Sequence, residues 1–332
     1  MLRYLAHRFL VMIPTLLAIS FIVFFVVHLP PGNFLETMIA ELQSQGEKVD
    51  PAKIEFLRQQ YGLDQPFIQR YFLWVINLLQ GDFGVSWEYD KPVWSIVSER
   101  LFLTFIVCLG TIIFTWIVAF PIGVYSATHQ YSWSDHGLTF VGFLGLATPN
   151  FLFALVIAYL ANAWLGIEIG GLMDEKYIDA PWTWGKIGNM LQHLWIPVIV
   201  IGTAGTAGMI RRLRANLLDE LQKQYVVTAR AKGLPPLKLL TKYPLRMALN
   251  PFISDIGDIL PDLVSGAVIV SIVLNLPTTG KLLYDSLVNL DTYLAASFLL
   301  FLALLTVIGV LISDLALAAL DPRIRLQGKA AK

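Results

Sequence analysis

The sequence predicts an all-α, polytopic membrane protein with six transmembrane helices. Hydrophobic residues make up 56% of the 332 residues and charged residues 14%, whereas an average soluble domain has about 25% charged residues. A helix needs about 20 mainly apolar residues to cross a bilayer, because lipid offers the backbone no hydrogen-bond partners. Six apolar runs approach or exceed that length: Phe9–Val27, Thr104–Tyr125, Leu138–Trp164, Leu194–Ile210, Ile256–Leu276 and Tyr293–Leu320.

Two of these runs need comment. The first is interpreted as a retained span rather than a signal peptide, because HLPPGN follows it instead of a small-x-small cleavage site. The fourth holds Gly202, Gly205 and Gly208. Such a row favours close packing of the helix against a neighbour, with a substrate path as the alternative.

The distribution of Lys and Arg predicts the orientation of the spans, because cytoplasmic connections carry the basic excess. Residues 211–255 hold nine basic and three acidic residues, and residues 321–332 hold four and one. Residues 28–103 hold six basic and ten acidic residues. With six spans, both termini and residues 211–255 lie on one side, which the basic excess identifies as the cytoplasm.

The predicted organisation has four parts. Residues 1–28 form the N-terminal end and the first span, and residues 29–103 form an external segment with amphipathic helices at Pro51–Gly62 and Pro66–Gly81. Residues 104–320 hold spans two to six, with the cytoplasmic loop 211–255, and residues 321–332 form a cytoplasmic tail. The second amphipathic helix has an aromatic stripe, which suits either the bilayer surface or an extracytoplasmic partner.

Composition and motifs exclude several functions. The net charge is zero, so no global field indicates nucleic acid. Cys108 is the single cysteine, which rules out a disulfide or a cysteine metal site within the chain. The five histidines lack metal-ligand spacing, and no glycine loop of the P-loop form is present. We therefore expect no catalytic, cofactor-binding or metal-binding residues, and any ATP-driven role requires a separate ATPase chain.

The basic segment Tyr225–Pro251 is predicted to form a helical elbow on the cytoplasmic side. A helical pattern leads into it and stops at Gly233, as expected of a left-handed glycine that ends a helix. Pro236 suits the first position of a second short helix, which Pro244 breaks. A slim elbow suits insertion into a cleft of a cytosolic protein. The alternative is a solvated basic loop held at the anionic lipid surface.

The elbow sequence TARAKG and the following LRMALNP resemble the signature loop of ABC importer permeases, in the form found in dipeptide and oligopeptide permeases. In that family the loop couples the permease to a groove on the ATPase subunit. The matching residues here are Thr228, Ala229, Arg230, Ala231, Lys232 and Gly233 in the elbow, and Leu245, Arg246, Ala248 and Pro251 in the return.

The resemblance extends over nearly the whole chain. It includes the N-terminal MLRYLAHRFLVMIP, ATPNFLFAL at Ala147–Leu155, LDPRIR at Leu320–Arg325, and YGLDQPFIQRYFLWVINLLQGDFGVS, which is typical of the first (B-type) permease subunit. The resemblance implies the ABC importer type I permease fold in a bacterial inner membrane. It implies half of a pathway for oligopeptides or similar solutes such as oligosaccharides. The implied partners are a second homologous permease, two ABC ATPase subunits and a periplasmic solute-binding protein.

Two features depart from the family pattern or compete with it. Ser271 stands where the family usually has glutamate. LPTTG at Leu276–Gly280 replaces a Trp-Pro-Gly-x-Gly turn, and DTYL at Asp291–Leu294 replaces Asp-Tyr-Pro. These departures leave the identity of the substrate open.

Acidic residues also occur within or near spans five and six, and these are Asp255, Asp258, Asp262 and Asp314. Asp255 and Asp258 are expected to pair with Arg246, Arg323 or Arg325. Asp262 and Asp314 are candidates for a role inside the membrane, and an ion-coupled secondary transporter is the alternative function.

Overall fold

A computed structural model describes residues 2–30, 39, 65–166, 170–178, 180–254 and 268–320. These residues are mainly helical. The chain divides into two compact units: Met1–Phe102 with Thr278–Val307, and Leu103–Pro277 with Ile308–Lys332. Each unit is described by itself.

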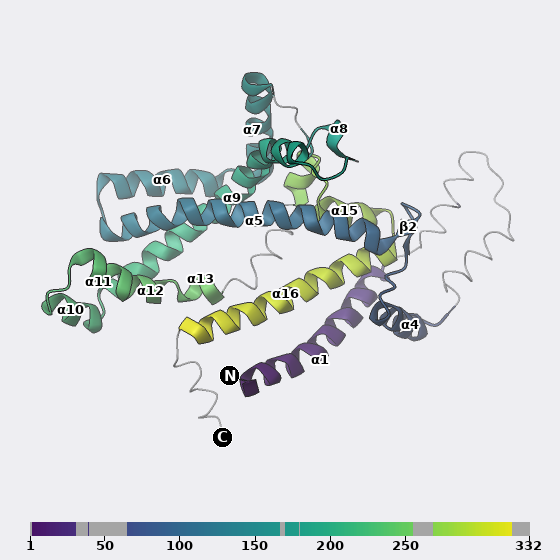
Figure 1. Cartoon of the computed structure of the whole chain (residues 1–332), viewed down its shortest axis with the longest axis horizontal. Helices are drawn as coiled ribbons and strands as arrows, with labels where there is room; N and C mark the ends of the chain where they lie inside the picture. The colour runs from purple at the N-terminus through teal and green to yellow at the C-terminus, as the bar shows by residue number, and fades with distance from the viewer. Residues whose placement is uncertain are drawn as a thin grey trace. The chain divides into compact units, whose positions relative to one another are not determined.

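Four helices of the described residues are long and apolar enough to cross a membrane (Figure 1). They are α1 (Leu2–Val27), α5 (Val93–Thr128), α9 (Trp184–Leu221) and α16 (Thr292–Leu320). They confirm the first, second, fourth and sixth predicted spans. Because α5 has 36 residues and α9 has 38, both exceed the hydrocarbon core, which about 20 residues cross.

The third predicted span is not one straight helix. The structure has α6 (Trp133–Ala147) and α7 (Asn150–Leu165), bent by 100° at the break between them. Pro149 lacks an N–H and disfavours the helical conformation of the residue before it, and Thr148 is extended at φ −83° and ψ 123°. Counting this pair as one span gives up to five candidate spans among the described residues. Most of the fifth predicted span lies outside the described residues. Its end at 268–276 is described, and residues 268–273 of it are helical.

In the first unit, the predicted helix Pro66–Gly81 is confirmed as α4 (Phe67–Leu79). Its stripe packs against α1 and the start of α16, in a cluster that includes Phe24, Tyr71, Trp74 and Ala295. The hydroxyls of Tyr71 and Ser20 are 2.9 Å apart and hydrogen-bonded. The aromatic stripe is therefore part of the fold of this unit. The other predicted amphipathic helix, Pro51–Gly62, lies outside the described residues.

A short hairpin in the same unit is fastened to the N-terminus of α16 by a buried carboxylate. The strands β1 (Val85–Ser86) and β2 (Lys91–Pro92) pair antiparallel. Asp291 Oδ2 accepts hydrogen bonds from Ser86 Oγ at 2.6 Å, Trp87 N at 2.9 Å and Glu88 N at 3.3 Å. Asp291 Oδ1 accepts from Leu294 N at 3.1 Å. Burial raises the pKa of Asp291, and these four hydrogen bonds oppose the rise by favouring the ionised form.

The second unit is built around α9, against which α6 and α7 pack. Two buried clusters lie along it, one including Val107, Ala158, Leu172 and Val200, the other including Ala119, Leu213, Leu217 and Phe252. A Cβ added to Gly202 would come within 2.6 Å of the Phe114 ring. The expected close packing of the glycine row is therefore confirmed at Gly202, where α9 meets α5. A Cβ at Gly208 would meet none of the described residues within 4 Å, so close packing is not seen at this glycine.

Candidate functional site

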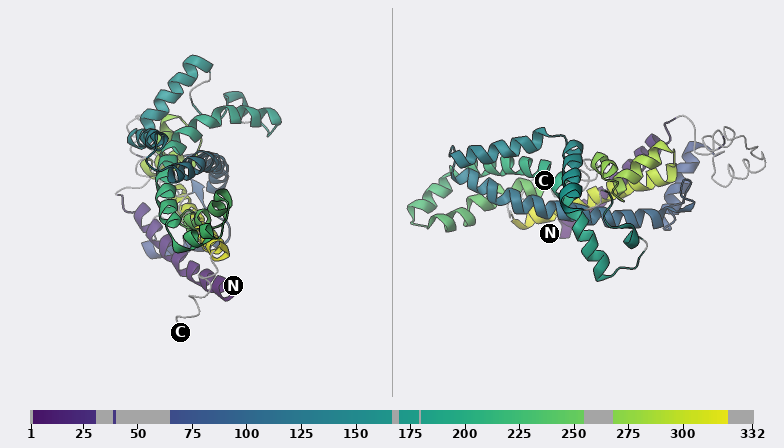
Figure 2. Two further views of the ribbon diagram at one scale, coloured as in Figure 1. Left: turned by 90° about the vertical axis from the view of Figure 1, so that its left-hand side faces the viewer. Right: turned by 90° about the horizontal axis from the view of Figure 1, so that it is seen from above.

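The cytoplasmic elbow predicted from the sequence is a chain of short helices that follows α9. Figures 1 and 2 show α10 (Gln224–Ala231) and α11 (Pro236–Lys242) projecting beyond the ends of α5 and α6. After α11, α12 (Pro244–Ala248) and α13 (Asn250–Ser254) lead back toward the membrane-spanning part of the unit. The order of helix, glycine turn, short helix and return is as predicted.

One detail of the prediction is wrong. The helical pattern from Leu217 to Ala229 suggested a single helix, but α9 ends at Leu221 and α10 is a separate helix. Lys223 between them is extended, at φ −67° and ψ 147°. The Tyr225 hydroxyl donates a hydrogen bond to Glu220 across this break. Partial burial and this bond raise the pKa of Tyr225 above its usual value.

Gly233 makes the turn between α10 and α11 possible. Its φ is +76°, in the left-handed region that side chains with a Cβ disfavour. The Leu234 N–H donates to Ala229 O at 3.3 Å and the Gly233 N–H donates to Arg230 O at 3.0 Å. This is the Schellman arrangement, which satisfies the last carbonyls of a helix. A Cβ at Gly233 would meet nothing within 4 Å, so the turn requires glycine for its conformation and not for space.

The elbow has a small hydrophobic core of its own. Val226 and Ala229 of α10 and Leu239 of α11 are buried against one another, with Leu234 and Tyr243 partly buried beside them. Ala229 suits this position because a larger side chain would separate α10 from α11. The elbow is therefore a packed hairpin of two helices and not a loose basic loop.

The return helix α12 fastens the elbow to α9. Ala248 and Phe252 are buried in one cluster with Leu213 and Leu217 of α9, and Leu245 packs against that cluster. The elbow and α9 are therefore joined by direct side-chain packing. Because α9 crosses the membrane region as one 38-residue helix, the contact reaches the transmembrane core.

The residues that match the family motif divide into two groups. Ala229 and Ala248 are buried and Leu245 is half-buried, and these three hold the elbow together. The exposed group consists of Thr228, Arg230, Ala231, Lys232 and Gly233, at and beside the turn, and of Arg246 in α12. Pro251 lies in α13. No acidic residue occurs between Gln222 and Ser254, so the exposed surface of the elbow is basic.

The predicted intramembrane acids are not brought together by the described residues. Asp255, Asp258 and Asp262 lie outside the described residues, as do Arg323 and Arg325. Asp314 is half-buried in α16, and its neighbour Ser313 donates a hydrogen bond to Ile253 O at 2.6 Å. Within the described part of the chain, no group of three His, Cys, Asp or Glu side chains is placed to hold a metal ion.

The structure adds an ion pair that the sequence reasoning missed. Asp135 at the start of α6 accepts two hydrogen bonds from Arg214 of α9, from Nε at 3.0 Å and from Nη2 at 2.7 Å. The sequence gives little indication of this ion pair. Asp135 lies in the first turn of α6 after the capping Ser132, a position where acids are common in helices. The pairing depends on how two distant helices pack, which periodicity alone does not show.

The long apolar helices define the class of the molecule, a multi-pass membrane protein. Residues 119–326 match the family described as "Binding-protein-dependent transport system inner membrane component", and residues 1–108 match the N-terminal family of the same components. The chain belongs to this family, and it is a permease subunit of an ABC importer.

Curated relatives match over almost their full length. The chain is 35% identical over 326 residues to the oligopeptide transport system permease protein AppB of Bacillus subtilis, covering 98% of this chain and 99% of that one. It is 29% identical to the dipeptide transport system permease protein DppB of Escherichia coli, with the same coverage of both chains. It is 30% identical to the glutathione transport system permease protein GsiC of Escherichia coli, again over 98% of this chain and 99% of that one.

A solved structure supports the fold. The inward-facing MetNI methionine ABC transporter matches with a TM-score of 0.53 at 14% identity, over 68% of this chain and 96% of that chain. At this identity the match supports the type I ABC importer permease fold and says nothing of the transported solute.

Proposed function

We propose that the chain is the first (B-type) permease subunit of a bacterial ATP-driven importer and forms half of the pathway for oligopeptides or similar solutes such as oligosaccharides. The printed names of the relatives support the peptide class, since they refer to oligopeptide, dipeptide and glutathione transport. Of the departures from the family pattern, Ser271 and Leu276 are each 1% exposed. Both are therefore packing positions in this chain, and they do not argue against a peptide.

In the proposed mechanism, the elbow binds the ATPase subunit and passes its movement to the membrane helices. Its exposed basic turn, formed by Thr228, Arg230, Ala231, Lys232 and Gly233, is the surface for an ABC ATPase subunit. Closure of two such subunits on ATP pushes the packed hairpin as one body. The α12 contact with α9 passes the movement into the membrane, which alternates the opening of the pathway between its two sides. ATP is hydrolysed by the separate ATPase subunits, and the bias between the two states comes from nucleotide and from the docking protein.

The remaining partners follow from the family. A second homologous permease completes the pathway, and a periplasmic solute-binding protein delivers the solute to the outer side. In this arrangement residues 29–103 are periplasmic, residues 211–255 and 321–332 are cytoplasmic, and both termini face the cytoplasm. The basic excess in residues 211–255 supports this orientation.

The test is substitution of the turn glycine. Gly233→Val places a β-branched side chain at a positive φ, which costs about 1 kcal/mol or more and re-aims the elbow. We expect normal membrane insertion and pairing with the second permease. We also expect loss of ATPase co-purification, or ATP hydrolysis without solute uptake.

Two controls accompany this variant. Gly188→Val adds the same side chain in α9 where a Cβ meets nothing within 4 Å, and φ there is not positive. Lys238→Gln removes an exposed charge of α11 away from the turn. Both should keep ATPase binding and uptake. Full ATPase binding and full uptake by Gly233→Val would show that the turn at Gly233 is not the coupling contact with the ATPase.

A further inference from the structure

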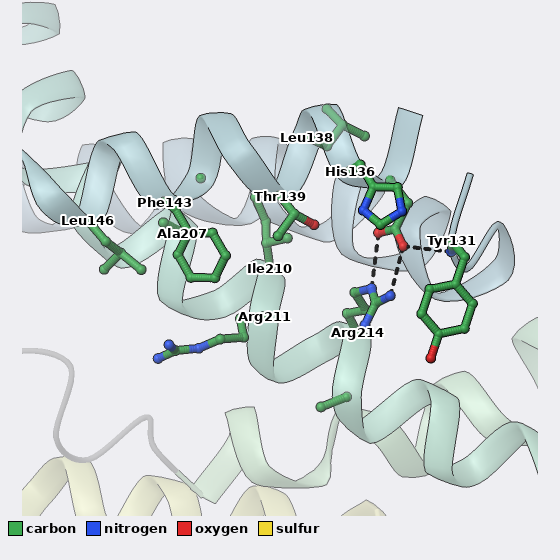
Figure 3. A pocket seen from close by; sticks show the side chains of 13 residues that line it. Tyr131, His136, Leu138, Thr139, Phe143, Leu146, Ala207, Ile210, Arg211 and Arg214 are labelled. Atoms are coloured by element: carbon green, nitrogen blue, oxygen red, sulfur yellow. Dashed lines mark hydrogen bonds and ion pairs between the residues drawn. The ribbon is translucent and has the colours of Figure 1, made fainter. Parts of the chain in front are cut away.

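A groove runs between α6 and α9, separate from the elbow (Figure 3). Its volume is about 270 Å³. Its walls are mainly apolar and are formed by Leu138, Phe143 and Leu146 of α6 and by Ala207 and Ile210 of α9. Phe143 is 52% exposed and Leu146 is 41% exposed, so the groove presents large apolar side chains to its surroundings.

One end of the groove is charged, and its single carboxylate is already satisfied. Asp135 is bound by Arg214 through two hydrogen bonds, and its Oδ2 also accepts from Tyr131 N at 3.0 Å. Arg211 is exposed, lines the groove, and forms no ion pair with any residue that the structure describes. Figure 3 shows its side chain extending away from the Asp135–Arg214 pair, beneath Phe143. The groove therefore has a net positive charge next to an apolar wall.

The groove lies near the membrane boundary on the side of the elbow. Arg211 and Arg214 belong to the last three turns of α9, which ends at Leu221 just before the elbow. Tyr131 is 73% exposed and Trp133 is 94% exposed at the start of α6, and such aromatic residues are typical of the membrane–water interface. In the proposed orientation this is the cytoplasmic leaflet, which carries anionic lipids.

We propose that this groove is a binding site for an anionic phospholipid of the cytoplasmic leaflet. One acyl chain lies along Phe143, Leu146 and Ile210, and the headgroup phosphate binds the guanidinium of Arg211. The Asp135–Arg214 pair closes one end and keeps α6 and α9 together while the groove is occupied. The choice of leaflet rests on the proposed topology, but the groove and its charge do not.

The experiment measures lipid retention by native mass spectrometry of the detergent-purified, full-length chain. The probes are phosphatidylglycerol and phosphatidylcholine with identical acyl chains, titrated in parallel. We expect tighter binding of phosphatidylglycerol, and Arg211→Gln should weaken it about fivefold, the value of one basic side chain near an anionic surface. Arg211→Lys keeps the charge and should retain most of the preference. Lys238→Gln, which removes an exposed cation outside the groove, should bind phosphatidylglycerol as the unmodified chain does.

Four outcomes would overturn the proposal. Equal retention of the two lipids would show only general solvation by lipid. Unchanged phosphatidylglycerol binding in Arg211→Gln would place the headgroup elsewhere. Efficient cross-linking of a cysteine at Phe143 to the second permease subunit in the intact transporter would show that a protein covers the groove. Competition by millimolar inorganic phosphate would reveal a simple anion site without an acyl chain. None of these results depends on ATPase coupling, so they leave the test of Gly233 untouched.

Discussion

Asp291 shows how much a single buried side chain can hold together in this protein. Its two carboxylate oxygens accept four hydrogen bonds, from Ser86, Trp87, Glu88 and Leu294. An amide in its place offers one accepting oxygen and one donating nitrogen, so one group of donors loses its acceptor. A buried donor left without a partner costs about 1–3 kcal/mol.

We therefore predict that Asp291→Asn loosens the hairpin while α16 remains in the membrane. The measurement is hydrogen exchange at residues 85–92, which should become faster than in the unmodified protein. Asp285→Asn in α15 (Thr279–Val288) is the control, because Asp285 acts electrostatically on Tyr89 of the hairpin but accepts none of the described hydrogen bonds from residues 85–92. Unchanged exchange in Asp291→Asn would mean that the hairpin is held by Trp87 and Tyr293 packing alone.

Two neighbouring alanines of the elbow should respond differently to enlargement. Ala229 is 7% exposed in the core between α10 and α11, whereas Ala231 is exposed. Ala229→Leu should separate the two helices and destabilise the elbow, because overpacking a small core costs about 1–3 kcal/mol. Ala231→Leu should leave the elbow folded and obstruct the proposed ATPase contact. Limited proteolysis at residues 222–243 distinguishes the two: cleavage should increase in Ala229→Leu and stay unchanged in Ala231→Leu.

At the scale of helices, the bend between α6 and α7 is testable. Phe140 and Tyr159 are exposed and stand 19 positions apart, a separation of about 28 Å along a straight helix. A bend of 100° brings them closer. Pro149→Ala restores the missing N–H and removes the restriction on Thr148. Spin labels at positions 140 and 159 should therefore lie farther apart in Pro149→Ala than with Pro149 in place. Equal distances would mean that packing against α9, and not proline, sets the bend.

The sequence predicts elements well where a local signal is strong. Runs of about 20 apolar residues predicted α1, α5, α9 and α16, and the positive φ of Gly233 followed from its place after a helical pattern. The bend at Pro149 was missed because prolines are tolerated within transmembrane helices, so the residue alone does not give the size of the bend. The break at Lys223 has no glycine or proline to mark it. Asp135 and Arg214 are 79 positions apart, and their pairing depends on the register of two packed helices.

For the whole molecule, the proposed topology makes a direct prediction. A C-terminal reporter fusion should report the cytoplasm and a fusion at Gly46 the periplasm, because residues 29–103 are expected outside. Phosphatase and fluorescent-protein reporters, each active on only one side, give opposite readings at the two sites. The same side for both fusions would overturn the six-span arrangement.

The energy source is the second prediction for the whole molecule. We expect Asp262→Asn to leave uptake dependent on ATP and independent of a proton or sodium gradient, since an ion-driven carrier has no need of the elbow. The measurement is uptake into proteoliposomes with and without the ATPase subunits. Gradient-driven uptake by the chain without an ATPase partner, lost in Asp262→Asn, would make the ion-coupled alternative correct.

The hydrogen bond from Ser86 to Asp291 also has a consequence for biosynthesis. It joins residues 205 positions apart. At a translation rate of roughly 5–20 residues per second, the hairpin waits about 10–40 s for the start of the last span to be made. During that interval the Trp87 and Glu88 amides lack their carboxylate acceptor. The hairpin can therefore reach its final form only after the start of α16 has been made. In the proposed topology, a chain that stops short of α16 exposes an unfinished hairpin to periplasmic proteases.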